Sequence, residues 1–79
     1  MLIRVVDSEK NLIASIEWQV YTDVNGQLLE RFIDNQGNVY LEEPRKEVRD
    51  CISLMEELKT KAIDFYQIPN LFIEIGRML

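Results

Sequence analysis

Hydrophobic and polar residues alternate along the first half of the chain with the period of two that predicts β-strands. The clearest run lies between residues 12 and 21, and its apolar side would be formed by Leu12, Ala14, Ile16, Trp18 and Val20. Three candidate turns divide the first half of the chain, and they lie at residues 8–11, Asn25-Gly26 and residues 35–37. We therefore expect a four-stranded antiparallel β-meander over residues 1–43.

The turns also predict which residues lie opposite one another, because loop length fixes the register of a hairpin. We interpret Asn25-Gly26 as a two-residue type I′ loop, and residues 35–37 as a three-residue loop with Gly37 in the left-handed conformation. Residues 8–11 would form a four-residue loop. The expected cross-strand pairs are Ile3 with Ile16, Val5 with Ala14, Trp18 with Ile33, Val20 with Arg31, Ile33 with Val39 and Phe32 with Tyr40. The inner face of the sheet would then collect Trp18, Val20, Leu29 and Ile33.

In the same register, three aromatic side chains gather on the outer face of the sheet, away from the helical half of the chain. An exposed aromatic patch on a small protein is typical of a protein interface. The residues expected to bind a partner there are Tyr21, Phe32, Tyr40, Gln19, Glu17 and Glu30. Two alternatives remain open: the last segment of the chain covers this face, or the aromatic pairs only stabilise the sheet.

The second half of the chain changes to a helical period. Pro44 suits the first turn of a helix, and apolar residues then recur at spacings of three and four. That stripe consists of Val48, Cys51, Ile52, Met55, Leu58, Ala62 and Tyr66. Ile68-Pro69-Asn70 ends the helix, because a residue before proline avoids the α region. We expect a short second helix over Leu71–Leu79, with a strand over Leu71–Ile75 as the alternative.

Composition indicates one ordinary α+β domain over residues 1–79, with a sheet in 1–43 and helices in 44–79 packed on one of its faces. The chain has 79 residues, of which 47% are hydrophobic, and a single cysteine. The N-terminal residues do not resemble a signal peptide, and no apolar run is long enough for a membrane span. We therefore expect a cytoplasmic protein without membrane contact. Cys51 is expected to be a small buried hydrophobe within the helix stripe.

The formal net charge of −5 is confined to one half of the chain. Residues 1–43 carry eight acidic and three basic side chains, whereas residues 44–79 carry six of each. An acidic surface repels phosphate backbones, so we expect no direct binding of nucleic acid. The chain also has no histidine, which removes the commonest general base and metal ligand. The remaining candidate for catalysis is a carboxylate pair formed by Glu17 and Glu30. Such pairs also occur on any solvent-exposed sheet face.

These observations predict a protein that is not an enzyme, with no cofactor, no metal and no small-molecule substrate. The favoured hypothesis is a small protein–protein interaction domain, which either forms a homodimer or docks on another protein through the outer sheet face. The alternative hypothesis is an acidic inhibitor of the phage type, which mimics the charge of nucleic acid and blocks a nucleic-acid enzyme. The observation behind this alternative is the net charge of −5 on a chain of only 79 residues.

Overall fold

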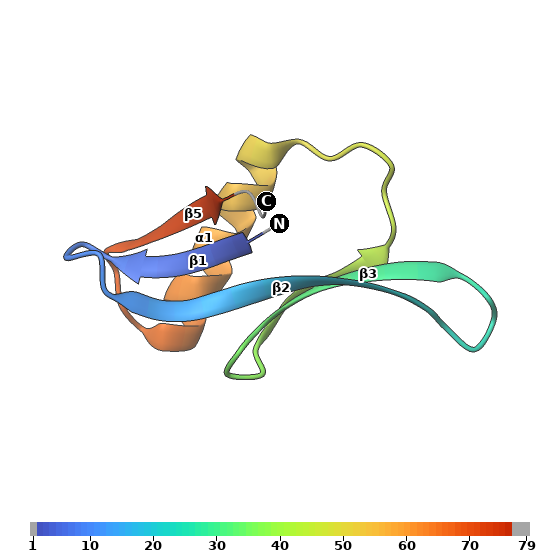
Figure 1. The fold of residues 1–79 in the computed structure, drawn as a ribbon, viewed down its shortest axis with the longest axis horizontal. Helices are drawn as coiled ribbons and strands as arrows, with labels where there is room; N and C mark the ends of the chain where they lie inside the picture. The colour runs from blue at the N-terminus through green and yellow to red at the C-terminus, as the bar shows by residue number, and fades with distance from the viewer. Residues whose placement is uncertain (1, 77–79) are drawn as a thin grey trace.

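The computed structural model describes residues 2–76, and in that range a five-stranded antiparallel sheet carries one helix on one face (Figure 1). The strands lie side by side in the order β4-β3-β2-β1-β5. The elements are β1 (Leu2–Asp7), β2 (Leu12–Thr22), β3 (Leu28–Asp34), β4 (Val39–Pro44), α1 (Cys51–Tyr66) and β5 (Leu71–Gly76). The predicted α+β class with an antiparallel sheet is confirmed, although the sheet has five strands rather than four.

The fifth strand replaces the predicted second helix, so the expectation that residues 44–79 are entirely helical is wrong. β5 pairs along the whole of β1 and buries Leu71 and Ile73 beneath α1. An isolated helix of this length would be marginal, whereas the free edge of β1 supplies backbone partners for a strand. The alternative strand of the sequence analysis is therefore the correct one. Met78 and Leu79, which belonged to the predicted helix, lie outside the described residues.

The three hairpin turns share one geometry, and an aspartate opens each of them. The side chains of Asp7, Asp23 and Asp34 each accept backbone N–H groups two and four residues further on, at 2.8–3.0 Å. The residue three positions after each aspartate has a positive φ, which is 70° at Lys10, 81° at Gly26 and 89° at Gly37. This arrangement is a three-residue loop closed by a left-handed residue.

The β2–β3 turn is therefore a three-residue loop, and the predicted two-residue loop at Asn25-Gly26 is wrong. The observed register pairs Trp18 with Phe32 and Val20 with Glu30. A slip of one residue moves every side chain of a strand to the other face. Phe32 is consequently buried under the helix, whereas the predicted inner residues Leu29 and Ile33 lie on the outer face of the sheet and are only partly buried.

The other two registers are partly as predicted. Ile3 pairs with Ile16 and Val5 with Ala14, as expected, although the loop has three residues and an irregularity follows at Val6. Ile33 pairs with Val39, as expected. A second irregularity between Phe32 and Ile33 then places Leu41 opposite Phe32, so the predicted pair of Phe32 with Tyr40 is wrong. Tyr40 is 2% exposed and meets Phe65 of α1 edge to face, with the ring centroids 5.0 Å apart.

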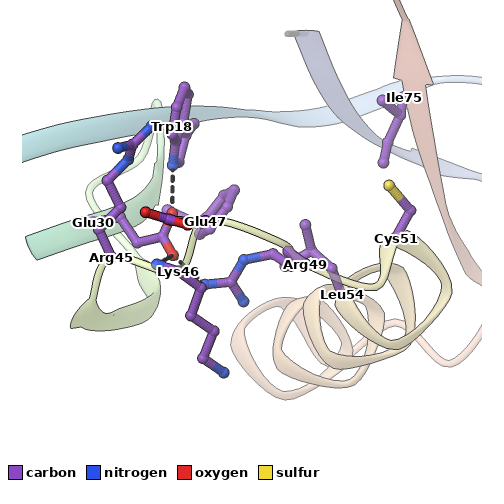
Figure 2. Close-up of a pocket in the computed structure, with 10 residues that line it drawn as sticks. Trp18, Glu30, Arg45, Lys46, Glu47, Arg49, Cys51, Leu54 and Ile75 are labelled. Carbon is purple, nitrogen blue, oxygen red and sulfur yellow. Dashed lines mark hydrogen bonds and ion pairs between the residues drawn. The ribbon is translucent and has the colours of Figure 1, made fainter.

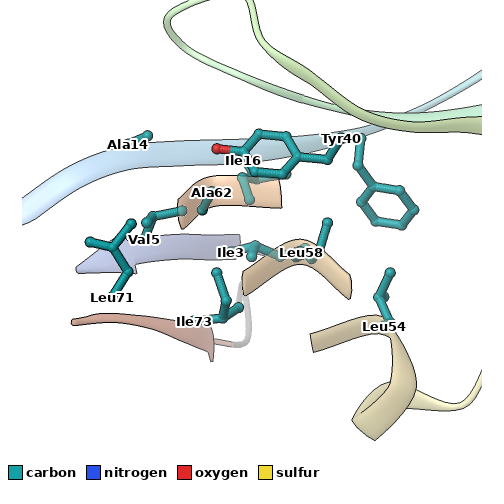
Figure 3. Packing of buried hydrophobic residues seen from close by; sticks show 11 residues of the cluster. Ile3, Val5, Ala14, Ile16, Tyr40, Leu54, Leu58, Ala62, Leu71 and Ile73 are labelled. Carbon is teal, nitrogen blue, oxygen red and sulfur yellow. The ribbon is translucent and has the colours of Figure 1, made fainter. Parts of the chain in front are cut away.

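The helix begins later than predicted, and its buried face matches the predicted stripe only in part: Leu58 and Ala62 are buried as expected, and Met55 and Tyr66 pack against the core. Pro44 ends β4, and Asp50 caps the helix by accepting the backbone N–H of Ile52 at 3.0 Å. The helix packs on the sheet through Leu54, Leu58 and Ala62. Of the predicted stripe, Val48 and Ile52 are 87% and 70% exposed, and Cys51 is exposed rather than buried. Figure 3 shows the core: Ile3, Val5, Ala14, Ile16, Phe32, Tyr40, Leu54, Leu58, Ala62, Leu71 and Ile73.

Candidate functional site: the groove beside Trp18

Strand β2 is longer than its neighbour β1, and this difference creates an open stretch of sheet. β2 has 11 residues and β1 has six, and their last described pair towards the β2–β3 turn is Ile3 with Ile16. Figure 1 shows the β2–β3 hairpin projecting beyond β1 and α1 as an arm. Since the helix does not cover this arm, Trp18 and Val20 stay 38% and 40% exposed on the face that is buried elsewhere.

The backbone of β2 is open along part of this arm. Both backbone groups of Ser15 point towards β3. Its N–H donates to the Asn35 side-chain oxygen, and its C=O accepts from the Asn35 backbone N–H, each at 3.0 Å. Backbone groups alternate in direction along a strand, so those of Val20 and Thr22 point away from β3. Among the described residues, no strand pairs with that side of Val20–Thr22. We call this stretch the free edge of β2.

A groove lies beside the free edge, between the arm, the loop of residues 45–50 and the first turn of α1 (Figure 2). Its volume is about 200 Å³. We call it the Trp18 groove. Its apolar lining consists of Trp18, Phe32, Cys51, Leu54 and Ile75, and its charged lining of Glu30, Arg45, Lys46, Glu47 and Arg49.

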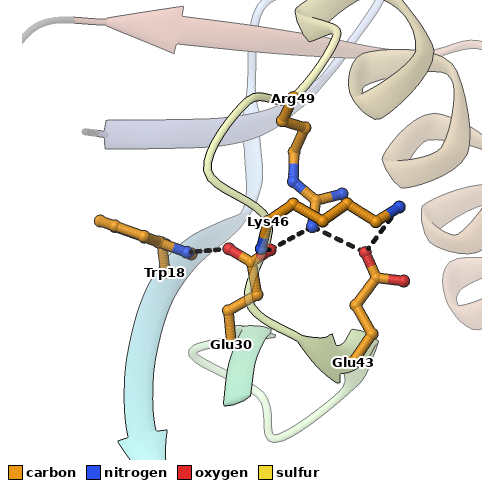
Figure 4. Close-up of polar contacts among 5 residues, drawn as sticks. All are labelled: Trp18, Glu30, Glu43, Lys46 and Arg49. Atoms are coloured by element: carbon orange, nitrogen blue, oxygen red, sulfur yellow. Dashed lines mark hydrogen bonds and ion pairs between the residues drawn. The ribbon is translucent and has the colours of Figure 1, made fainter. Parts of the chain in front are cut away.

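An ion-pair network built around buried Glu30 holds the charged side of the groove in place (Figure 4). Glu30 is 3% exposed, and it accepts hydrogen bonds from Trp18 Nε1 at 2.9 Å, from the Lys46 backbone N–H at 3.2 Å and from the Arg49 guanidinium. Arg49 also donates to Glu43 at 2.7 Å, and Lys46 Nζ lies 3.5 Å from the same carboxylate. The network thus links β2, β3, β4 and the 45–50 loop.

The chemistry of this network is that of an anchor rather than of an acid–base catalyst. Burial raises the pKa of Glu30, but the hydrogen bonds from Arg49, Trp18 and Lys46 outweigh it and hold this pKa below its usual range. The hydrogen bond from Arg49 lowers the pKa of Glu43 as well. A general base near neutral pH needs a raised carboxyl pKa, so ionised Glu30 serves to fix the Trp18 ring and the Arg49 loop.

A second buried carboxylate, Asp34, fixes the opposite end of the helix. It is 5% exposed and accepts hydrogen bonds from the Tyr40 hydroxyl at 2.8 Å, from the Tyr66 hydroxyl and from Asn38 Nδ2 at 3.2 Å. Burial raises the pKa of Asp34, and these bonds together lower it below its usual range. This cluster ties the β3–β4 turn to the last turn of α1, which is a structural role.

The structure separates the six residues expected to form an outer binding face. Phe32 and Tyr40 lie in the core, and Glu30 lies beneath the Trp18 groove. The outer aromatic patch is therefore wrong, because the register and the irregularity at Phe32 turn these side chains inward. Glu17 remains exposed on the outer face, on the other side of the sheet from Glu30, so the two carboxylates do not form the pair considered for catalysis.

The outer face itself carries a polar network in place of the aromatic patch. Arg31 donates to the side chain of Gln19 at 3.0 Å, and its guanidinium lies 5.4 Å from the centroid of the Tyr21 ring. The Tyr21 hydroxyl bonds to Glu42, which also lies 3.9 Å from Arg31. Gln19 and Tyr21 are therefore committed to contacts within this face.

Sequence reasoning missed the groove, although one signal for it is present in the chain. Asp23 and Gly26 repeat the spacing of Asp34 and Gly37, which indicates the same three-residue loop and hence the correct face for Phe32. With that register, Trp18 and Glu30 share the inner face, as observed. No comparable signal identifies Arg49, which lies in the loop two residues before the helix begins.

The described part of the chain lacks two further features. In residues 2–76, no group of three or more histidine, cysteine, aspartate or glutamate side chains is placed to hold a metal ion. Over the same range, no helix has the length and apolar character needed to cross a membrane. Comparison of the chain with protein-family models, with curated proteins and with solved structures gives no significant match.

Proposed function

We propose that this chain is a small protein-binding domain and that the Trp18 groove, with the free edge of β2, is its binding surface. The observation that carries the proposal is the exposure of Trp18 and Val20, 38% and 40%, on the inner face of the sheet beside an apolar groove. Tryptophan next to a pocket is enriched at the energetic centres of protein interfaces. The proposal keeps the predicted function class and moves its surface from the outer face to the groove.

The rigidity of the groove supports this proposal. The Trp18 ring is oriented by Glu30, and Glu30 is held by Arg49 and by the backbone of Lys46. A binding surface whose side chains are already ordered loses less conformational entropy when a partner docks. The same network keeps the 45–50 loop at the rim of the groove.

The test compares two exposed aromatic residues on different parts of the sheet. Phe72 on β5 is 46% exposed and lies outside the groove, so Phe72→Ala is a matched control for Trp18→Ala. Immobilised wild-type chain and both variants are used to capture proteins from the native host, after circular dichroism has shown that each variant is folded. We expect Trp18→Ala to lose the captured partner and Phe72→Ala to retain it. Equal capture by the two variants contradicts the assignment of the groove.

A second candidate function is the acidic inhibitor, which is favoured by the placement of charge. The entire excess of negative charge lies in residues 1–43, which form the first four strands up to Glu43. An inhibitor that mimics nucleic acid binds through pairs between its carboxylates and basic residues, and added salt screens such pairs. We expect its affinity for a basic partner to fall steeply between low and physiological salt. Binding that ignores salt contradicts this second candidate.

A further inference from the structure

We infer that the partner adds an extended strand to the free edge of β2, with apolar side chains toward the Trp18 groove and lysine or arginine side chains toward the outer face. This inference rests on the proposed function and specifies the chemistry of the partner. Strand addition supplies main-chain hydrogen bonds for affinity, and it supplies side-chain pockets at every second position for specificity. Both elements are present at this edge.

The first element is the backbone of Val20 and Thr22. Their N–H and C=O groups point away from β3, and no described strand lies opposite them. Such a row of free groups is a template for pairing with another chain. An added strand would continue the line of β1 along the sheet.

The other two open edges carry features that discourage pairing, and the free edge of β2 does not. β4 presents Glu42 and Glu43 and ends with Pro44, and charged residues and proline protect edges. On β5, the Lys59 ammonium from α1 lies 5.4 Å from the centroid of the Phe72 ring, so a helix side chain reaches round that edge. Val20, Tyr21 and Thr22 include neither a charge nor a proline.

The inner side of an added strand would face the Trp18 groove. Of the charged lining, Arg49 contacts Glu30 and Glu43 and Lys46 contacts Glu43. The two other charged lining residues, Arg45 and Glu47, add one charge of each sign. The apolar lining is then the surface left for a partner, and the groove of about 200 Å³ offers its apolar side chains a place to pack. The inner positions of the added strand are therefore apolar.

The outer side of an added strand would meet negative charge. Glu17 and Asp23 lie at the two ends of the open stretch and belong to the outer set of alternate positions. Glu17 is exposed, and no described lysine or arginine lies within ion-pair distance of it. Two arginines lie on this face, and both are engaged within the chain: Arg31 by Glu42 and Gln19, and Arg4, opposite Ser15, by Glu74. With a chain net charge of −5, this arrangement favours a basic partner.

A second copy of the chain fits the same edge poorly. Each copy carries a charge of −5, and its own free edge, Val20–Thr22, has no basic residue to place beside Glu17. The occupant is therefore a segment of a different, positively charged protein.

The test uses purified chain and synthetic nine-residue peptides. In one set, valine, isoleucine or phenylalanine alternates with lysine, and in the matched set glutamate replaces lysine. Trp18 is the only tryptophan of the chain, so its fluorescence reports directly on the groove. Amide hydrogen exchange of Val20 and Thr22, followed by NMR, reports on the edge. We expect lysine peptides to shift the Trp18 emission and to slow exchange of both amides by at least about tenfold.

Two variants separate the backbone and charge contributions. Val20→Pro removes an outward-pointing N–H, and proline is tolerated where that group faces solvent. It should leave the fold intact by circular dichroism and weaken peptide binding by about tenfold or more. Glu17→Lys should weaken lysine peptides and strengthen glutamate peptides, whereas Glu57→Lys, on the exposed side of α1, should change neither.

Each contrary outcome overturns a stated part of the inference. Failure of every peptide at millimolar concentration, or binding without protection of Val20 and Thr22, overturns strand addition. Equal binding of lysine and glutamate peptides overturns the basic partner. Protection that grows with protein concentration in the absence of peptide identifies a second copy as the occupant. If the peptides do not bind, bind without protecting the amides or bind regardless of charge, loss of host-protein capture by Trp18→Ala would still support the proposed function. Failure of this inference is therefore distinguishable from failure of the proposed function.

Discussion

The indole Nε1 of Trp18 donates a hydrogen bond of 2.9 Å to a carboxylate oxygen of Glu30, a side chain that is only 3% exposed. The second oxygen of this carboxylate accepts from Arg49 and from the backbone N–H of Lys46. One buried charge therefore determines both the orientation of the most prominent groove side chain and the path of the 45–50 loop. The stability of this part of the fold and the shape of the groove should consequently change together.

Replacing Glu30 with glutamine tests this coupling. Glu30→Gln keeps the size of the side chain but leaves the Arg49 guanidinium, whose side chain is 18% exposed, without its buried counter-charge. Removing one partner of a buried ion pair is strongly destabilising, and the second contact of Arg49, with Glu43, moderates the loss. We expect the free energy of unfolding to fall by about 2–4 kcal/mol, with a red shift of the Trp18 emission. Urea denaturation followed by circular dichroism measures the change.

The control removes both charges. Glu30→Gln with Arg49→Met leaves no buried charge without a partner, so the double variant should be more stable than Glu30→Gln alone. Its Trp18 emission should stay red-shifted, because the indole has still lost its charged acceptor. A Glu30→Gln variant within about 0.5 kcal/mol of the wild type would show that the network does not hold the groove.

The same carboxylates predict loss of stability in acid. In the folded chain, the pKa values of Glu30, Glu43 and Asp34 lie below their usual range, after hydrogen bonds have outweighed the opposing effect of burial at Glu30 and Asp34. The unfolded chain therefore binds protons first as the pH falls, and the stabilisation present above about pH 5 is lost toward pH 3 and below. Chemical denaturation at a series of pH values measures this dependence. Glu30→Gln should show a shallower slope, and an identical slope would rule out Glu30 as a contributor.

Asp34 and Asp23 open turns of the same geometry, so they form a matched pair for mutation. Asp34 is 5% exposed and also accepts from two tyrosine hydroxyls, whereas Asp23 accepts only within its own turn. Asp34→Ala would leave the Tyr40 hydroxyl, with its ring in the core, without its acceptor. We expect a loss of about 3 kcal/mol for Asp34→Ala and about 1 kcal/mol for Asp23→Ala. Thermal or urea unfolding of the two variants checks the difference, and equal losses would contradict the role of the tyrosine cluster.

Sequence reasoning succeeded where the signal was local. Alternation and turn spacing predicted the antiparallel sheet, the pair of Ile3 with Ile16 and the pair of Ile33 with Val39. The prediction failed at Asn25-Gly26, because the preference of Asn-Gly for two-residue turns was given more weight than the preceding Asp23. The Asp23 carboxylate bonds to two backbone N–H groups of the turn and so stabilises the longer loop.

The remaining errors came from features that depend on distant residues. Leu71–Gly76 forms a strand because β1, at the other end of the chain, offers an open edge, and no local pattern encodes that edge. Cys51 was expected inside, and it lies on the same helical face as Leu54 and Leu58. It is exposed because this first residue of the helix lines the Trp18 groove rather than packing on the sheet. The groove exists because β2 extends beyond the end of β1. This difference in length depends on both strands, so the sequence of either strand alone does not predict it.

The shared turn geometry predicts opposite effects for two substitutions at equivalent positions. Lys10 and Gly26 occupy the same left-handed position, with φ values of 70° and 81°, and only glycine adopts it without strain. Lys10→Gly should therefore raise the free energy of unfolding by about 0.5–1 kcal/mol, and Gly26→Ala should lower it by about 1 kcal/mol. Among residues 2–76, the only charged partner of Lys10 is Glu74, at 3.4 Å, and this exposed pair contributes little. Denaturation midpoints of both variants decide the matter, and a destabilised Lys10→Gly would mean that the contact with Glu74 outweighs the strain of the turn.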